Sequence, residues 1–326
     1  MDKNEQYAHT RQRILHGCRL VLSAGFVFIA IGINPLFGQN EFANWVWRDS
    51  NFVSWNSGAP VLQTGFDLET SRPGQACISD RNGNLLLVAD GDHFYNGSGQ
   101  LMINGAPAIS SRSEQTFVVP YPCNDSLYYV FWTSSLSVVI PGVHYSLVNV
   151  YSNGGQGEVI QHDILLDSTM ALALDITRHE NNRDYWLVSR KRAAPVFYAW
   201  QITDTGIISQ PVISLTDSVL NYANFHGDHT NEMKFSPNGE WLAYTDRHVG
   251  AYVGPNHITS LFSFDQQTGI VQREVQLNTS SLPYNTRQKF HCFSPDNSKL
   301  YIVAQERALY QFDLLSNDSS TIANSG

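Results

Sequence analysis

Alternating apolar and polar residues on either side of a short turn occur twice in the second half of the chain. The first copy runs from Lys234 to Tyr244 (KFSPNGEWLAY) and the second from Cys292 to Val303 (CFSPDNSKLYIV), and Phe293 follows Phe235 by 58 positions. Each copy has the pattern of a strand ending at Phe, a tight turn on Ser-Pro-Asn or Ser-Pro-Asp, and a second strand with period-two alternation. Each therefore predicts one β-hairpin.

A hairpin of this kind cannot bury both of its faces alone, so its repetition predicts a stack or ring of small sheets. Strand patterns and turn residues mark five such units, and no segment of useful length between them has a helical period. The units start near Ala76, Thr116, Ala173, Glu232 and Lys289. With four strands in each unit, the sequence predicts an all-β fold, namely a β-propeller of about five four-stranded blades.

Short aromatic strands between Trp45 and Leu62 precede these units. We interpret them as the outer strands of a blade whose inner strands come from elsewhere, because propellers commonly close the ring with strands from both termini. The last unit has only its hairpin and one strand up to Leu315, followed by a polar tail. We therefore expect residues 39–326 to form an incomplete ring, truncated at its carboxyl end, from a propeller of about seven blades.

The amino-terminal segment has the composition of a signal peptide. A basic flank with three arginines precedes Leu20–Ile33, an uncharged apolar run of 14 residues. Pro35 then breaks the helix, and Gly38 offers a small residue for cleavage. The run is short for a bilayer span, which needs about 20 residues. We expect residues 1–38 to be removed on export, and an uncleaved membrane anchor is the alternative.

Composition limits the classes of partner. A chain of 326 residues with 42% apolar and 15% charged residues can bury a large core. Its formal net charge is -9, and an acidic surface repels phosphate backbones. The sequence therefore argues against nucleic acid as a partner, and it predicts membrane contact only through the signal segment during export.

Three cysteines remain after removal of the signal segment, Cys77, Cys123 and Cys292, so at most one disulfide forms. None of them has the spacing of metal ligands. Cys77 and Cys292 stand just before repeat hairpins. We interpret them as small buried residues rather than reactive thiols.

Short motifs follow one another in a fixed order along nearly all of residues 39–326. They are Trp45–Trp47 with Ser57–Gly58, Cys77–Asp80 with Gly83–Leu86 and Asp90–Gly91, Leu101–Met102 with Asn104–Gly105, Val118–Pro120, Tyr128–Val130, and Tyr145–Ser146 with Gly154–Gly155 and Gly157. In this combination the chain resembles the amino-terminal propeller of large exported proteins of Bacteroidetes, the gliding-motility-associated or type IX secretion sorting-domain proteins. The resemblance implies one module of a multidomain protein, with further blades, immunoglobulin-like modules and a carboxy-terminal sorting domain.

One cluster is a candidate metal site. His226, Asp228 and His229 stand close together, with Asp246 and His248 one strand later, and imidazoles and carboxylates at one face of a propeller can bind a metal. Loop histidines more commonly satisfy turns, and the resemblance supplies no matching histidine pair. His226, Asp228 and His229 are therefore weak candidates, and we expect neither a metal nor a cofactor.

Two other polar clusters have simpler explanations. Asp90-Gly-Asp92-His93 lacks the spaced carboxylates of a calcium loop, so we interpret it as a hairpin turn. Arg190-Lys-Arg192 is interpreted as a solvated loop. The sequence contains no nucleophile elbow, phosphate loop or zinc-protease motif.

The sequence thus predicts an exported, surface-displayed or secreted binding or structural module without catalytic residues, whose loops contact a protein or a glycan through Tyr and Trp side chains. The alternative is an enzyme resembling the propeller lactonases, with a metal and acid–base side chains in the central channel. Such an enzyme brings carboxylates or histidines together from successive blades. The sequence shows one local cluster only, and we therefore favour binding.

Overall fold

The computed structural model divides the chain into residues 1–38 and one compact unit, residues 39–326. It describes residues 40–47, 51–63, 74–90, 93–106, 113–134, 142–192, 194–216, 232–247, 257–277, 288–304, 308–316 and 318–326. The expected signal peptide lies outside these residues. Within them, no helix is long and apolar enough to cross a bilayer.

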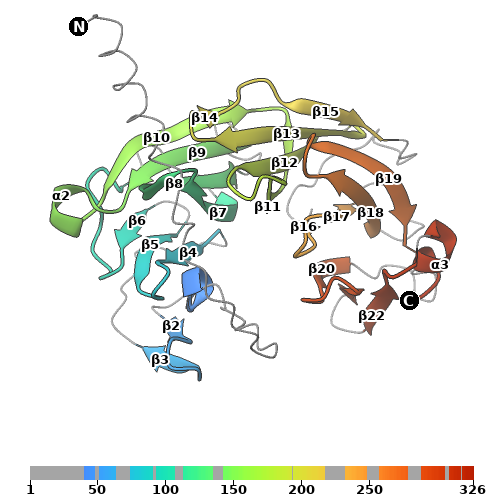
Figure 1. Cartoon of the computed structure of the whole chain (residues 1–326), viewed down its shortest axis with the longest axis horizontal. Coiled ribbons are helices and arrows are strands. Elements are labelled where there is room, and N and C mark those ends of the chain that lie inside the picture. The colour runs from blue at the N-terminus through green and yellow to red at the C-terminus, as the bar shows by residue number, and fades with distance from the viewer. Residues whose placement is uncertain are drawn as a thin grey trace, which may run out of the picture. The chain divides into compact units, whose positions relative to one another are not determined.

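The described residues form six antiparallel sheets, in which each strand except β15 pairs with its neighbours along the chain (Figure 1). The first three sheets contain β1 (Asn44–Trp47), β2 (Asn51–Ser54) and β3 (Val61–Gln63); β4 (Ala76–Ser79), β5 (Leu85–Ala89) and β6 (Phe94–Asn96); and β7 (Ser113–Tyr121), β8 (Asn124–Ser134), β9 (Gly142–Asn149) and β10 (Glu158–Asp167). The last three contain β11 (Met170–Arg178), β12 (Tyr185–Lys191), β13 (Val196–Thr203), β14 (Gly206–Ile207) and β15 (Val212–Leu215); β16 (Glu232–Phe235), β17 (Trp241–Arg247), β18 (His257–Asp265) and β19 (Ile270–Gln276); and β20 (Gln288–Phe293), β21 (Lys299–Ala304) and β22 (Ala308–Asp313). The short helices are η1 (Asn40–Phe42), α2 (Ser152–Gly155) and α3 (Ser319–Ala323).

The predicted all-β propeller fold is confirmed, although the number of strands per sheet varies. The third and fifth sheets have the predicted four strands, and the fourth has five because β14 and β15 both pair with β13. The described parts of the first, second and sixth sheets have three strands each. Leu101–Ile103 makes only isolated bridges, from Leu101 to Tyr95 and from Ile103 to Glu158.

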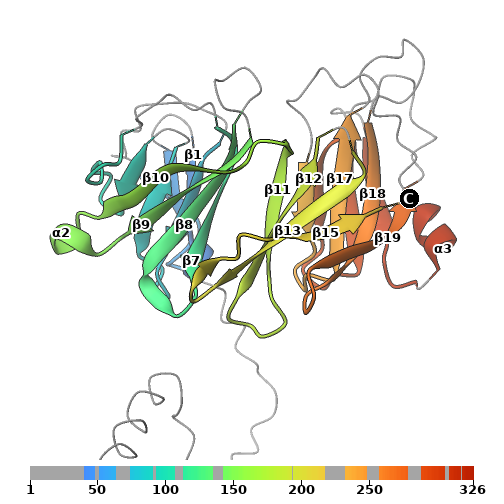
Figure 2. The same ribbon diagram turned by 90° about the horizontal axis from the view of Figure 1, so that it is seen from above.

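The first strand of each sheet lies beside the first strand of the next one. Contacts join β1 to β4, β4 to β7, β7 to β11, β11 to β16 and β16 to β20, and we call these six the inner strands. Figure 2 shows β11 between the third and fifth sheets. The amino-terminal strands were expected on the outer side of a blade, but β1 is an inner strand, because it lies beside β4, the first strand of the second sheet.

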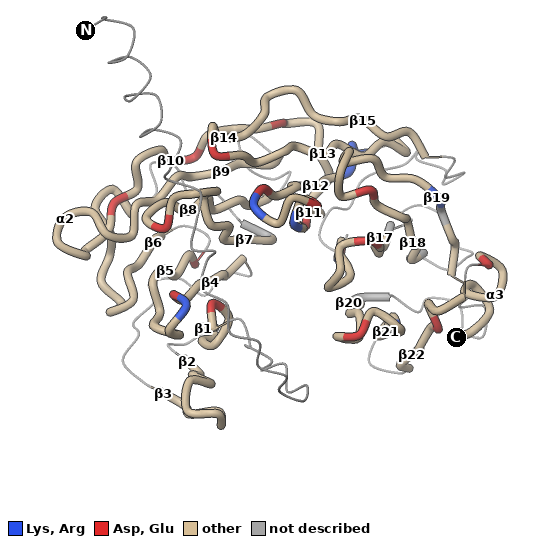
Figure 3. The backbone as a smooth tube through the Cα atoms, in the orientation of Figure 1, with Lys and Arg blue, Asp and Glu red and all other residues tan. Residues whose placement is uncertain are grey.

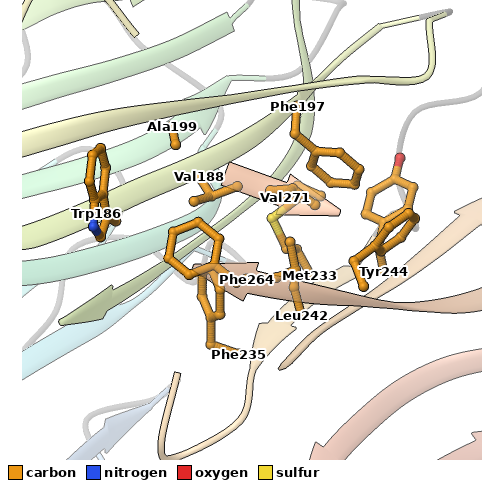
Figure 4. Packing of buried hydrophobic residues seen from close by; sticks show 12 residues of the cluster. Trp186, Val188, Phe197, Ala199, Met233, Phe235, Leu242, Tyr244, Phe264 and Val271 are labelled. Atoms are coloured by element: carbon orange, nitrogen blue, oxygen red, sulfur yellow. The ribbon is translucent and has the colours of Figure 1, made fainter. Parts of the chain in front are cut away.

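Each pair of neighbouring sheets shares one apolar cluster. Between the fourth and fifth sheets, Trp186 and Phe197 meet Phe235 and Phe264 (Figure 4). Burying one such side chain stabilises the fold by about 1.5–3 kcal/mol. The four middle sheets are therefore packed on both faces, whereas the first and sixth sheets each join only one of these clusters.

The two Ser-Pro turns predicted from the repeat are confirmed and have the same hydrogen bonds. The N–H of Ser236 donates to the carbonyl of Trp241 at 2.8 Å, and that of Ser294 to the carbonyl of Lys299 at 2.9 Å. The fourth turn residue has a left-handed φ in both, 75° at Gly239 and 62° at Asn297. The first turns of the second, third and fourth sheets also have a left-handed residue, at Gly83, Cys123 and Asn182.

Two sequence interpretations are wrong. Cys292 is exposed rather than buried, because it lies on the face of β20 that points away from the fifth sheet. Arg190 is not in a solvated loop: it lies on β12 with 1% of its surface exposed. Its guanidinium carbon is 4.7 Å from the ring centre of Tyr244 and 5.4 Å from that of Phe197, and these rings compensate for its burial.

Two further interpretations are supported. Cys77 is a half-buried free thiol, and burial raises its pKa, which fits an unreactive residue. The Asp90 segment is a hairpin turn, since the N–H of His93 donates to the Asp90 carboxylate at 2.8 Å and the N–H of Asp90 donates to the His93 carbonyl at 3.1 Å. Asp92 lies outside the described residues.

Candidate functional site

A hollow of about 750 Å³ lies against four inner strands and the turns that follow three of them. This volume is in the range of ligand pockets. The lining residues are Glu41, Phe42, Ile78–Asn82, Phe117–Cys123, Asp125, Tyr128, Tyr151, Asp175–Arg178, Asn182, Arg183, Tyr185 and Lys234. We call this space the central hollow, because β4, β7, β11 and β16 all contribute to it.

Charges of both signs line the central hollow at its turns. Arg81 of the β4–β5 turn lies 3.9 Å from Asp125 at the start of β8, and both side chains are more than four-fifths exposed. An exposed pair of this kind contributes little to stability and can exchange its partner for a ligand. Figure 3 shows both charge signs beside β7 and β11.

An acid–base pair from two successive sheets lies deeper in the hollow. The ammonium group of Lys234 on β16 is 3.6 Å from Oδ1 of Asp175 on β11, and it lies 5.9 Å from the ring centre of Phe117 on β7. Burial raises the pKa of Asp175, although the positive charge of Lys234 opposes the rise. Lys234 is still half exposed, so its ammonium group remains accessible to a ligand.

Aromatic side chains form the apolar part of the wall. Arg178 lies over the ring of Tyr185 at 5.4 Å, which holds both side chains at the surface of the hollow. Burial raises the pKa of Tyr128 to about 12, so its hydroxyl stays protonated at neutral pH. Together with Phe117, these residues offer flat apolar surfaces beside hydrogen-bonding groups.

Side chains on three inner strands accept hydrogen bonds from the backbone of the next inner strand. Gln115 on β7 accepts the N–H of Leu174 at 3.1 Å, and Asp175 on β11 accepts the N–H of Phe235 at 2.6 Å. Glu232 on β16 accepts the backbone N–H of His291 on β20. We call these contacts the inner-strand links. They satisfy backbone N–H groups at the strand edges, and this structural role explains why the carboxyl groups of Asp175 and Glu232 are buried.

Glu232 and His291 are close to each other but do not form an ion pair at neutral pH. Oε2 of Glu232 is 3.7 Å from Nδ1 of His291. Burial raises the pKa of Glu232 to about 8 and, with the charge of Lys234, lowers the pKa of His291 to about 3, so both are uncharged at pH 7. The Nδ1 atom of His291 is also 3.3 Å from Oγ1 of Thr245. Neither Glu232 nor His291 lines the central hollow.

The metal candidates from the sequence are not tested by the structure. His226, Asp228, His229 and His248 lie outside the described residues, and Asp246 is placed only by its backbone on β17. Among the residues that are described, no group of three or more His, Cys, Asp or Glu is placed to hold a metal ion.

The sequence interpretation missed Asp175, Glu232, Lys234 and His291, which are residues of three successive sheets. Each stands on a strand among apolar residues, and an ionisable residue at such a position was the signal for them. The structure brings Asp175 and Lys234 together in the central hollow, and Glu232 and His291 together between the fifth and sixth sheets.

Comparison with known proteins adds a likeness of fold. No family model and no curated protein matches the chain. Among solved structures, Hsv2p of Kluyveromyces lactis has a TM-score of 0.45 at 14% identity, over 82% of this chain and 70% of that one. A Lactobacillus plantarum protein has a TM-score of 0.45 at 12% identity, over 82% and 74%. At these values the likenesses carry no argument about function, so the propeller assignment rests on the sheet topology described above.

Proposed function

We propose that this chain is a non-catalytic binding module whose ligand, a segment of a protein or a glycan, occupies the central hollow. This proposal rests on the composition of the wall of the hollow, where aromatic rings such as those of Phe117 and Tyr185 lie beside exposed charges of both signs. Flat apolar surfaces with a few polar groups around them recognise sugar rings and peptide side chains alike. The exposed pair of Arg81 and Asp125 adds groups that can orient such a ligand.

Two of the carboxyl groups that line the hollow, those of Asp175 and Asp80, favour binding over catalysis because they are already engaged in hydrogen bonds. Asp175 accepts the N–H of Phe235, and Asp80 accepts the N–H groups of Asn82 and Asn84, both at 2.8 Å. A general base must instead be within reach of a substrate proton. These two acids therefore support the architecture of the hollow rather than proton transfer.

The setting of this binding activity is part of the proposal. The basic flank and apolar run before Gly38 support export, and the ordered motifs from Trp45 to Gly157 support a role within a gliding-motility-associated or type IX secretion protein. In that setting the module works at the cell surface or in the medium. The acidic composition is compatible with a protein or glycan ligand.

The experiment is a binding screen followed by a matched pair of variants. The labelled protein is applied to glycan and peptide arrays, and the affinity of the strongest hit is then measured for Tyr185→Ala and Tyr198→Ala. Tyr185 and Tyr198 both pack on the cluster between the third and fourth sheets, but only Tyr185 lines the hollow. We expect Tyr185→Ala to weaken binding about tenfold or more and Tyr198→Ala to leave it unchanged. Equal affinities for both variants would place the ligand elsewhere.

A further inference from the structure

One end of the central hollow is formed by η1, the β4–β5 turn and the start of β8. Hydrogen bonds hold the first two of these against each other. The side-chain amide of Asn40 donates to the carbonyl of Arg81 at 2.8 Å, and that of Asn44 donates to the carbonyl of Gly83 at 2.7 Å. Glu41 stands between these two asparagines in the chain, so its carboxyl group lines the hollow beside the turn.

Three carboxyl groups gather around the hydroxyl group of Tyr128 at this end. Burial raises the pKa of Tyr128 to about 12, and Tyr151 adds to the rise. The charges of Asp125, Glu41 and Asp80 raise it further. Salt screens charges beyond about 8 Å at physiological ionic strength, so these carboxylates act on the hydroxyl group from nearby. We call Glu41, Asp80 and Asp125 the acidic end of the hollow.

The acidic end has more negative than positive charge. Arg81 also lines the hollow here, and its guanidinium group is 3.9 Å from the carboxylate of Asp125. The carboxylate of Asp80 accepts hydrogen bonds from uncharged N–H groups. Within the described part of the chain, neither Glu41 nor Asp80 forms an ion pair. One arginine is thus set against three carboxylates.

The cations elsewhere in the hollow are compensated, with one exception. Lys234 lies 3.6 Å from Asp175, and Arg183 lies 2.9 Å from Asp184. Arg178 contacts an aromatic ring rather than a carboxylate. Two carboxylates without an ion pair at the acidic end therefore exceed the one such cation at the other end, and the hollow retains an attraction for a positive charge.

Exposed aromatic rings complete the acidic end. Phe42 follows Glu41 in η1 and is 59% exposed, and Tyr151 is 52% exposed. Both line the hollow. The face of an aromatic ring attracts a lysine or arginine cation, and carboxylates bind the same cation through charge-assisted hydrogen bonds. Rings and carboxylates together suit a basic side chain, whereas a neutral sugar would use the rings and leave the charges unmatched.

We propose that the ligand of the central hollow is a basic segment of a protein, with a Lys or Arg side chain in the acidic end. This inference rests on the binding function proposed above. The incoming cation takes the place of Arg81 beside Asp125, and this exchange costs little because the pair is exposed to solvent. The formal net charge of -9 attracts a basic partner over longer distances.

The test compares a fluorescein-labelled arginine peptide with the same peptide carrying neutral citrulline in place of arginine. Fluorescence polarisation with the full chain at physiological salt should show about tenfold tighter binding of the arginine peptide. Asp125→Asn should remove most of this preference. Arg81→Gln should strengthen binding of the arginine peptide about threefold, because it removes the internal competitor. Equal affinities for the two peptides, or weaker binding by Arg81→Gln, would overturn the proposal.

The matched control is Glu240→Gln, which removes the same charge from an exposed residue that does not line the hollow. Its remaining oxygen still accepts the side-chain amide of Asn238. The control should bind both peptides like the parent, and thermal melts confirm that all variants are folded. All proteins share residues 1–38, so any effect of that segment is common to them.

Two outcomes separate this inference from its alternatives. An equal loss in Glu240→Gln and Asp125→Asn would show a general effect of net charge and overturn the proposal. A neutral glycan as the strongest array hit, weakened by Tyr185→Ala but not by Asp125→Asn, would also overturn it and would leave the proposed binding function of the hollow intact.

Discussion

Stability between pH 6.5 and 8 should depend on the proton of Glu232. Burial raises the pKa of this carboxyl group from 4.5 to about 8 in the folded chain. Between these values the unfolded chain has released the proton and the folded chain still holds it. Stability must therefore fall as the pH rises through this window, by about 1.4 kcal/mol per pH unit.

His291 has the opposite effect in a lower window. Its pKa falls from 6.5 to about 3 on folding, so between these values the unfolded chain binds a proton that the folded chain excludes. Its contribution to stability consequently rises with pH up to 6.5. The two slopes cancel between pH 4.5 and 6.5, where both windows overlap. Above pH 6.5 only Glu232 contributes, and the expected loss up to pH 8 is about 2 kcal/mol.

The decisive variant is Glu232→Gln, which keeps an oxygen to accept the N–H of His291 but has no proton to release. Guanidinium unfolding followed by tryptophan fluorescence gives the unfolding free energy at pH 5.5, 6.5 and 8 for parent and variant. Contributions of other titrating groups cancel in the difference between the two proteins. The loss of about 2 kcal/mol above pH 6.5 should disappear in the variant. An equal loss in both proteins would show that Glu232 does not carry this proton.

Three further predictions address other parts of the chain. Gly239→Ala should lower thermal stability more than Gly58→Ala. Both positions have a left-handed φ, which costs alanine about 1–2 kcal/mol, but of the two only Gly239 has side chains, those of Gln266 and Thr177, where the new Cβ would lie. Equal losses of stability would exclude the packing contribution. Amino-terminal sequencing of the exported protein should find a start just after Gly38, and recovery of intact Met1 in the membrane would contradict cleavage. Elemental analysis of the parent and of the His226→Ala/His229→Ala double variant should find no stoichiometric metal and equal stability, whereas a tightly held ion in the parent would make these histidines ligands.

The local pattern was enough to predict the hairpins and the fold class. Phe235 and Phe293 end their strands where the repeat places them, because a Ser-Pro turn with a left-handed fourth residue is encoded within a few positions. One strand without such a marker, β10, was missed. β10 was not predicted because its burial is irregular and its pairing with β9 is interrupted by bulges, including one at Asp163, which has a φ of 54°.

The candidate site could be predicted only in part, because its residues meet through the stacking of sheets rather than through sequence spacing. Asp175 and Lys234 are 59 positions apart in the chain yet 3.6 Å apart in space. The position of β1 was also misjudged, since an aromatic strand has the same pattern on the inner and outer side of a blade. Arg190 was assigned to a solvated loop because a basic cluster usually faces solvent. The sequence does not show that the fold places the rings of Phe197 and Tyr244 beside its guanidinium group.

The inner-strand links have a consequence for how a chain of this kind can change its length. In each link, only one partner is a side chain, and the other is a backbone N–H, which every residue except proline provides. A repeat unit inserted after one of these three acceptors would therefore meet it with a backbone N–H, whatever side chains its own first strand carries. For that contact, the side chains of the inserted strand are free to vary.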